Sequence, residues 1–191
     1  MKVALTGSHG TGKTTLLNHL AALLEARSES VAVCREVPRV IAVEADDPGF
    51  FRRGTNAPLR QALIFFRQVV EEGLREAEAD IVLADRTVVD HLAYTVALFP
   101  ELGASPEGRA LTSAVQAWIG RYDLIVKLPI EFPAIDDGTR EAGEAFQAEI
   151  DHTIDALYEQ FATPRSVVRG TVEERAAAVV ALIEAARRAE R

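Results

Sequence analysis

The stretch Gly7–Thr15, with the sequence GSHGTGKTT, most constrains what this chain can fold into. It matches the pattern G-x-x-x-x-G-K-[ST] at every fixed position. A short apolar run at residues 2–6 precedes it, and leucines at helical spacing follow it. A glycine-rich loop that joins a buried strand to a helix N-terminus is the context in which this motif binds phosphate. The alternative is a glycine-rich turn before an ordinary helix, which would leave all four matched positions to coincidence. The sequence therefore predicts a site for a nucleoside triphosphate.

The chemistry of the loop assigns roles to its residues. Glycines let the backbone curl so that N–H groups point inward, and the helix terminus attracts anions. We expect Lys13 to reach the β- and γ-phosphates of ATP and the Thr14 hydroxyl to ligate Mg²⁺. His9 occupies a variable position of the pattern and is expected to be solvated. The full predicted set for nucleotide binding is Gly7, Gly10, Thr11, Gly12, Lys13, Thr14 and Thr15.

Composition narrows the class of protein. The 191 residues suit one domain, residues 1–191, and an apolar fraction of 48% should give it a core. The net charge of −8, with acidic residues scattered, argues against a general nucleic-acid or membrane surface. The single cysteine, Cys34, lies in an apolar run, which indicates a small core residue and excludes a disulfide framework. Because no signal peptide or membrane-length apolar stretch is evident, we expect a cytoplasmic protein. The oligomeric state stays open, a homodimer being one alternative.

Apolar strand-like runs alternate with helical patterns along the whole chain. This alternation predicts an α/β fold with a parallel sheet covered by helices on both faces. The strands are expected at residues 2–6, 31–34, 81–84, 124–128 and 166–169. Helices are expected at about 13–26, 58–79, 106–120 and 144–161 and from 172 onward, with a short helix that ends at about residue 43 and another that contains His91, Leu92 and Tyr94. The helix at 58–79 is predicted from an apolar stripe of Leu59, Leu63, Phe66, Val70 and Leu74. Two further helix starts carry capping-box patterns, Thr87 with Asp90 and Thr171 with Glu174.

In such sheets ligands bind beyond the carboxyl ends of the strands, so the residues after each strand are the candidates for function. Glu36 and Arg39 follow the second strand, Asp85 and Arg86 follow the third, and a polar segment at 136–140 follows the fourth. The fourth strand lacks the N-K-x-D element that a small GTPase would need. Arg86 stands where a typical ATPase motor has a second acid, and an arginine there suits binding of phosphate. These features favour transfer of phosphate to a small acceptor over hydrolysis.

Taken in order, these motifs resemble the P-loop kinases similar to nicotinamide riboside kinase, and more distantly the deoxynucleoside and thymidylate kinases. The resemblance spans Val3 to Arg175 and is carried by the glycine loop, the segments at 35–39 and 137–140, and Asp85-Arg86-Thr87 with Tyr94. It implies a three-layer P-loop NTPase fold of sheet order 2-3-1-4-5, with a lid at about 131–145. No adenylyltransferase domain or DNA-binding segment accompanies the predicted kinase, so the identity of the substrate does not carry over.

The resemblance also implies which residues take part in catalysis and binding. Glu36 matches the acid that faces the acceptor hydroxyl. Asp85 matches an acid near Mg²⁺ or the acceptor, Arg86 an arginine near phosphate, and Arg140 a lid arginine that closes over the transferring phosphate. The predicted catalytic residues are Lys13, Glu36, Asp85, Arg86 and Arg140, the predicted metal ligands Thr14 and Asp85, and the predicted acceptor-binding residues Glu36, Arg39, Arg86 and Tyr94.

Each assignment has a structural alternative. Glu36 could form a surface ion pair with Arg35 or Arg39. Asp85 could cap the following helix, although Thr87 already suits that role. Arg140 could be an ordinary loop arginine. Core or surface roles compete with acceptor binding for a further set, Gln61, Phe65, Gln68 and Tyr94.

The sequence therefore predicts an ATP- and Mg²⁺-dependent kinase acting on a hydroxyl of a nucleoside-like or other small metabolite. Two other functions stay open. A nucleoside monophosphate kinase would use Arg39, Arg52 or Arg86 to hold the phosphate of its acceptor. A regulatory switch would bind nucleotide, hydrolyse it slowly and act on a protein partner.

Overall fold

The computed structural model describes residues 1–44, 57–131 and 143–189. Five strands form one sheet whose order is β2-β3-β1-β4-β5, and every pair in it is parallel. The strands are β1 (Lys2–Thr6), β2 (Val31–Cys34), β3 (Ile81–Asp85), β4 (Leu124–Lys127) and β5 (Ser166–Val167). The predicted fold class and strand order are thus confirmed. The fifth strand is shorter than expected, because only Ser166 and Val167 pair with β4.

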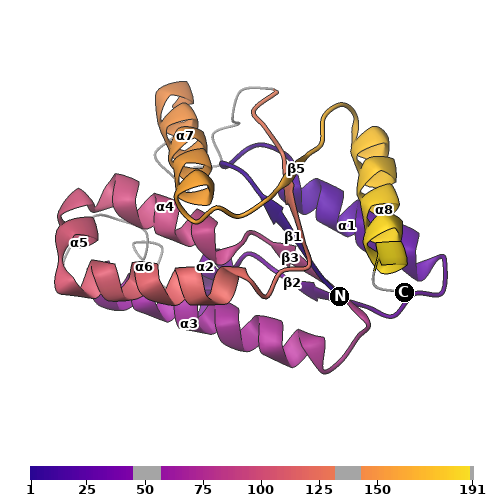
Figure 1. Cartoon of the computed structure of the whole chain (residues 1–191), viewed down its shortest axis with the longest axis horizontal. Coiled ribbons are helices and arrows are strands. Elements are labelled where there is room, and N and C mark those ends of the chain that lie inside the picture. Colours follow the sequence, from indigo (N-terminus) through magenta and orange to yellow (C-terminus); the bar gives the residue numbers. More distant parts are fainter. Residues whose placement is uncertain (45–56, 132–142, 190–191) are drawn as a thin grey trace.

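Helices cover both faces of this sheet (Figure 1). They are α1 (Lys13–Glu25), α2 (Val37–Glu44), α3 (Ala57–Glu76), α4 (Val88–Leu98), α5 (Pro100–Ala104), α6 (Pro106–Ile119), α7 (Glu144–Gln160) and α8 (Val172–Ala189). The short helix α5 is absent from the expectations above; Pro100 at its first turn and Ser105 before Pro106 divide this part of the chain into two helices. Where bounds were predicted for a helix, the structure agrees with them to within about three residues. No helix of the described residues is both long and apolar enough to cross a membrane.

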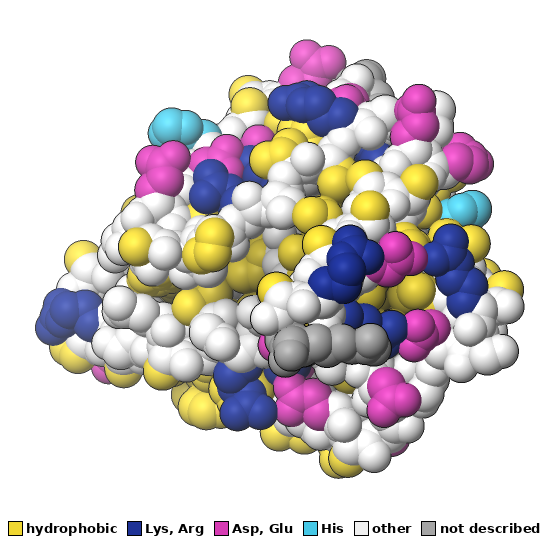
Figure 2. Space-filling view, turned by 45° about the vertical axis from the view of Figure 1, so that its right-hand side comes forward, with side chains coloured by type: hydrophobic (Ala, Val, Ile, Leu, Met, Phe, Trp, Pro, Cys, Tyr) yellow, Lys and Arg dark blue, Asp and Glu magenta, His cyan; other side chains and the backbone are white. Residues whose placement is uncertain are grey.

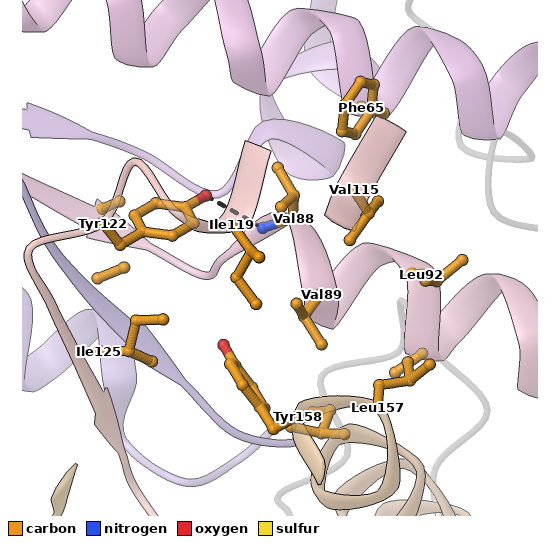
Figure 3. Packing of buried hydrophobic residues seen from close by; sticks show 14 of the residues in the cluster. Phe65, Val88, Val89, Leu92, Val115, Ile119, Tyr122, Ile125, Leu157 and Tyr158 are labelled. Atoms are coloured by element: carbon orange, nitrogen blue, oxygen red, sulfur yellow. Dashed lines mark hydrogen bonds between the residues drawn. The ribbon is translucent and has the colours of Figure 1, made fainter. Parts of the chain in front are cut away.

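The central strand β1 divides the apolar core into two layers. Val3 and Leu5 pack with α1 and α8, whereas Ala4 between them belongs to the cluster formed with α4, α6 and α7. Alternate side chains of a strand point to opposite faces, which explains the division. Within the second cluster, the hydroxyl of the buried Tyr122 accepts a hydrogen bond from the Val88 backbone N–H at 3.2 Å (Figure 3). Cys34 is 1% exposed, as its apolar setting predicts.

Buried charge also ties the sheet to α3. Lys2 is 2% exposed, and its Nζ lies 3.0 Å from Glu72 Oε2 and 2.6 Å from Glu76 Oε1. The fully buried Glu72 also accepts hydrogen bonds from Trp118 Nε1 at 2.8 Å and from the Tyr122 hydroxyl at 2.7 Å. A buried carboxylate with this many donors is compensated for its loss of water. The face of α3 that carries Glu72 is therefore fixed against the sheet.

The apolar stripe predicted on α3 is exposed in the structure and does not face the core. Its period correctly predicts a long helix, but the five side chains of the stripe point outward and are 49–70% exposed. The opposite face, with Ile64, Phe65, Gln68 and Glu72, is the buried one. Elsewhere, on the surface seen in Figure 2, basic side chains are interspersed with acidic ones. The stripe is thus a row of five exposed apolar side chains on one helix.

Candidate functional site

The glycine loop leaves β1 and enters α1 in the conformation that its sequence requires. Gly7 has φ 138°, and a Cβ there would lie 2.4 Å from the Leu128 carbonyl oxygen. Gly10 and Gly12 also have positive φ, at 73° and 86°. Residues that carry a Cβ atom rarely adopt such backbone angles, so each of the three positions favours glycine. The loop therefore brings its backbone to the N-terminus of α1 as the motif predicts.

Lys13 lies folded back into this loop and is 5% exposed. Its Nζ donates to the Ser8 carbonyl oxygen and, at 3.3 Å, to the Thr11 hydroxyl. Burial, followed by the positive charge of Arg86, lowers the pKa of Lys13 to about 7. The nearby carboxylates of Asp90, Asp85 and Glu36 oppose this shift. The site therefore holds an ammonium group whose charge is incompletely compensated, which is a setting that an anion would stabilise.

Thr14 and Asp85 meet at the edge of the site. The Thr14 hydroxyl donates to Asp85 Oδ2 at 2.6 Å, although the two residues are 71 positions apart in the chain. Because β3 pairs with β1, the end of β3 places Asp85 beside the start of α1. Asp85 does not cap the next helix, since Thr87 and Asp90 form the predicted capping box there. The structure thus brings together the two oxygen donors that the sequence predicts as metal ligands.

Glu36 and Arg86 form a buried ion pair across the ends of β2 and β3. Arg86 Nε donates to Glu36 Oε1 at 2.9 Å, and Arg39 Nε lies 3.3 Å from Glu36 Oε2. The surface pairing considered for Glu36 is therefore only part of its environment, since Glu36 is 8% exposed while Arg39 is 59% exposed. Burial alone would lower the pKa of the Arg86 guanidinium, but Glu36 and other acids raise it above the ordinary value. Arg86 stays charged inside the protein.

Arg86 is also held in an unusual backbone conformation. Its φ is 92°, which is rare for a residue other than glycine. Its N–H donates to the Leu5 carbonyl at 3.0 Å, and its carbonyl accepts from Gln68 Nε2 at 3.3 Å. The guanidinium lies 5.1 Å from the centre of the Tyr94 ring. Its buried NH1 has no hydrogen-bond partner among the described residues. A strained backbone and a buried N–H group without a hydrogen bond, both at one residue, are typical of a residue that binds a ligand.

Asp90 is a site residue that the sequence analysis placed only as a cap. Its carboxylate accepts from the Thr6 hydroxyl at 2.9 Å and from the Gly7 N–H at 3.0 Å, and it also accepts two bonds from Thr87. It lies 3.9 Å from Arg86 NH1. One fully buried carboxylate thus fixes both the start of the glycine loop and the start of α4. No sequence signal separates this role from ordinary capping.

We expect Asp90→Ala to lower the free energy of unfolding by about 3–5 kcal/mol, because it leaves buried donors on Thr6, Gly7 and Thr87 without an acceptor. Glu174→Ala is the matched control, since Glu174 occupies the same position in the exposed capping box of α8. The control should lose only about 1 kcal/mol. Urea unfolding of both variants measures the difference, and equal losses would contradict the role assigned to Asp90.

Three more residues reach the loop from distant parts of the chain. The Tyr94 hydroxyl lies 3.2 Å from the His9 backbone N and 3.0 Å from His9 Nδ1. Gln147 Nε2 donates to the His9 carbonyl at 2.8 Å, and Arg175 NH1 donates to the Thr11 carbonyl at 2.8 Å. His9 is 7% exposed, so the prediction that it is solvated is wrong. Its neighbours in space come from α4 and α7, and sequence spacing does not reveal them.

The remaining residues that the sequence suggested for the site lie in the core, bond to a neighbouring helix, or fall outside the described residues. Gln68 is fully buried and bonds Glu72 at 2.7 Å, and Phe65 is 4% exposed in the core, so neither forms an open pocket wall. Gln61 accepts from the Thr95 hydroxyl at 2.9 Å. Arg140, with the rest of the polar segment at 136–140, and Arg52 lie outside the described residues. Their predicted roles stay predictions.

The fold of this chain is similar to that of a protein of known structure. A solved structure of thymidylate kinase from Ehrlichia chaffeensis is similar, with a TM-score of 0.64 and 16% sequence identity over 96% of this chain and 98% of that one. At this identity the likeness concerns the fold. No curated protein matches this sequence. The narrower resemblance to nicotinamide riboside kinase and the deoxynucleoside kinases stays a prediction.

The family of the chain is shown by a match to a family model. The model described as an AAA domain matches residues 2–175, which span the glycine loop, both capping boxes and the arginine that reaches Thr11. Since the match covers most of the 191 residues, the chain belongs to the AAA domain family.

Proposed function

We propose that the protein is an ATP- and Mg²⁺-dependent phosphotransferase that moves the γ-phosphate to a hydroxyl of a small, nucleoside-like acceptor. The observation that carries this proposal is the buried Glu36–Arg86 pair beside the glycine loop, in which Arg86 NH1 has no hydrogen bond among the described residues. A carboxylate and a guanidinium at one point can serve an acceptor hydroxyl and a transferring phosphoryl group together.

The phosphate end of the site is built from the loop. Loop N–H groups and the start of α1 would bind the phosphates of ATP, and Lys13 would turn from the Ser8 carbonyl towards them. Bound phosphate would raise the pKa of Lys13 again, because it supplies the negative charge that burial of the lysine leaves missing. Binding and charge compensation at Lys13 are therefore coupled.

The residues that would hold Mg²⁺ are Thr14 and Asp85. A hydroxyl and a carboxylate oxygen 2.6 Å apart are the hard donors that this ion prefers, and it commonly takes few protein ligands while phosphates and waters complete its shell. When bound, the ion would neutralise charge on the phosphates. The described residues contain no cluster of three or more metal-ligating side chains, so a pre-built multi-carboxylate cage is not the arrangement proposed.

Glu36 is the better placed of the two acids to receive the hydroxyl proton. Asp85 is engaged with Thr14, whereas Glu36 lies at the end of β2 between Arg86 and the exposed Arg39. Arg86 would donate to the oxygens of the γ-phosphate through NH1, which has no hydrogen bond among the described residues. Arg140 stays part of the proposal as a lid arginine, on the resemblance alone.

A nucleoside monophosphate kinase is the second candidate. The fold is similar to that of a protein named thymidylate kinase, and thymidylate is a nucleoside monophosphate. Arg39 is 59% exposed beside Glu36 and could bind the phosphate of such an acceptor. Against it, Arg39 is already paired with an acid of its own chain, since its Nε lies 3.3 Å from Glu36 Oε2.

The test is release of ADP from ATP and Mg²⁺ in the presence of single acceptors. The panel pairs each nucleoside with its 5′-monophosphate and adds sugars and amino-acid-like alcohols. We expect a nucleoside or related alcohol to stimulate ADP release. Stimulation only by a monophosphate would favour the second candidate. Slow release that no acceptor stimulates would contradict both and favour a regulatory nucleotide switch.

A further inference from the structure

Helix α3 carries apolar residues on two opposite faces, and only one of them is buried. The exposed stripe holds Leu59 at 70%, Leu63 at 49%, Phe66 at 60%, Val70 at 54% and Leu74 at 56% exposure. These positions lie on one side of the helix, over about 22 Å of its length. In Figure 1, α3 runs along the lower edge of the molecule. A continuous apolar face of this length on a monomer usually marks an interaction surface.

We propose that this stripe is the interface at which two copies of the chain pair through antiparallel α3 helices. The spacing of the stripe fits a two-fold axis. Leu59 and Leu74 are equidistant in sequence from the midpoint between Phe66 and Arg67, and so are Leu63 and Val70. An axis through that midpoint sets Leu59 against Leu74 of the partner subunit, and Leu63 against Val70 of the partner subunit. An interface between identical copies requires this reciprocal pairing.

The charges of α3 also suit a second copy. Two of the three glutamates of α3, Glu72 and Glu76, pair with Lys2 on the opposite face of the helix. The charges nearer the stripe are compensated within the same chain: Arg75 lies 2.6 Å from Glu78. Arg67 beside the stripe lies 3.1 Å from Glu44 and 3.0 Å from Glu71 of its own chain. Two molecules of net charge −8 repel each other less through a face whose charges are paired within each copy than through their acidic surfaces. A lipid surface would instead favour Lys and Arg side chains that are not paired with glutamates of the same chain.

The area and the rigidity of the stripe are sufficient for a dimer interface. Five side chains that are 49–70% exposed present on the order of 500 Å² per copy. Pairing therefore buries about 1,000 Å², which is the threshold for a specific interface. Phe66, at the centre, already packs edge-on against the buried Phe65, with ring centres 5.3 Å apart. Antiparallel helices also align their dipoles favourably. Little ordering of the anchor residue is then required on association.

The test is sedimentation velocity of the full chain over a range of concentrations. The wild type should sediment as a dimer, and Val70→Glu should raise the dimer dissociation constant by about 100-fold or more, because it buries an unpaired charge. Val167→Glu is the matched control, since Val167 on β5 is 53% exposed, compared with 54% for Val70. Circular dichroism checks that both variants are folded. A monomeric wild type, or equal weakening by both variants, would overturn the proposal.

Cysteine pairing tests the direction of the helices. Protein with Leu59→Cys mixed with protein with Leu74→Cys should form a disulfide-linked dimer under mild oxidation, whereas each variant alone should not. The native Cys34 is 1% exposed and does not compete. A parallel pairing would cross-link each variant with itself, and that result would overturn the antiparallel arrangement.

Discussion

Lys13→Met should reduce phosphoryl transfer by about 10³-fold or more and at the same time make the empty protein more stable. The loss of transfer follows from removing a positive charge that acts on the phosphates. The gain in stability follows from burial, which lowers the pKa of Lys13 from 10.5 to about 7. Methionine fills a similar volume without a charge to desolvate. Steady-state kinetics and thermal unfolding of the same preparation measure both effects.

The stability difference should depend on pH in a defined direction. Below about pH 7 both the folded and the unfolded lysine are protonated, and folding bears the full cost of burying the charge. Between about pH 7 and 10.5 the unfolded state binds more protons than the folded state, so the wild type gains stability as pH rises. The advantage of Lys13→Met, a few kcal/mol at pH 7, should therefore shrink towards pH 10. A constant difference across this range would contradict the account of Lys13.

Lys127→Met is the control for this substitution. Lys127 is also buried, at 3% exposure, but its Nζ lies 3.0 Å from Asp151 and 2.6 Å from Asp155. Removing it takes a buried cation from Asp151 and leaves Arg165 as the cation beside Asp155. The control should therefore be destabilised, and the folded protein should retain transfer. The two lysine variants thus move stability in opposite directions. Loss of transfer in both would mean that neither effect is specific to the loop.

Glu36→Gln and Asp85→Asn should each lower kcat by about 10²–10⁴-fold, for different reasons. Glu36 is proposed to take the hydroxyl proton, and its loss also leaves the buried Arg86 without its main partner. Asp85 is proposed to act through a metal ion that it would hold together with Thr14, from whose hydroxyl it accepts a hydrogen bond at 2.6 Å. Raising the Mg²⁺ concentration should therefore partly restore Asp85→Asn and leave Glu36→Gln unchanged. Equal restoration of the two variants would contradict this division of roles.

The fold could be predicted from the sequence because its signals are local and repeated. Apolar runs that alternate with helical periods, two capping boxes and one glycine loop each report on a few neighbouring residues, and together they imply the parallel sheet. The stripe on α3 shows the limit of this reasoning. Periodicity predicts a helix, but α3 buries the face with Gln68 and Glu72 and exposes its most apolar face. In a single sequence, an apolar face that the folded chain exposes cannot be distinguished from one that it buries.

The candidate site was predictable only where residues follow strands directly. Glu36, Asp85 and Arg86 meet because parallel strands end at one edge. Asp90 and Arg175 were not predicted as site residues, since their contacts with the loop cross 83 and 164 positions of the chain. The buried setting of His9 is likewise tertiary, because it depends on Tyr94 and Gln147. Such contacts leave no periodic trace.

The central claim concerns the fate of the γ-phosphate. ATP labelled at that phosphate should be incubated with Mg²⁺ and the most effective acceptor of the panel, and the products separated and followed by ³¹P NMR. Transfer predicts that the label appears on the acceptor as a phosphate ester, in amounts equal to the ADP formed. Label that appears only as inorganic phosphate, at the same rate with and without acceptor, would contradict the proposal and make the protein a nucleotide hydrolase.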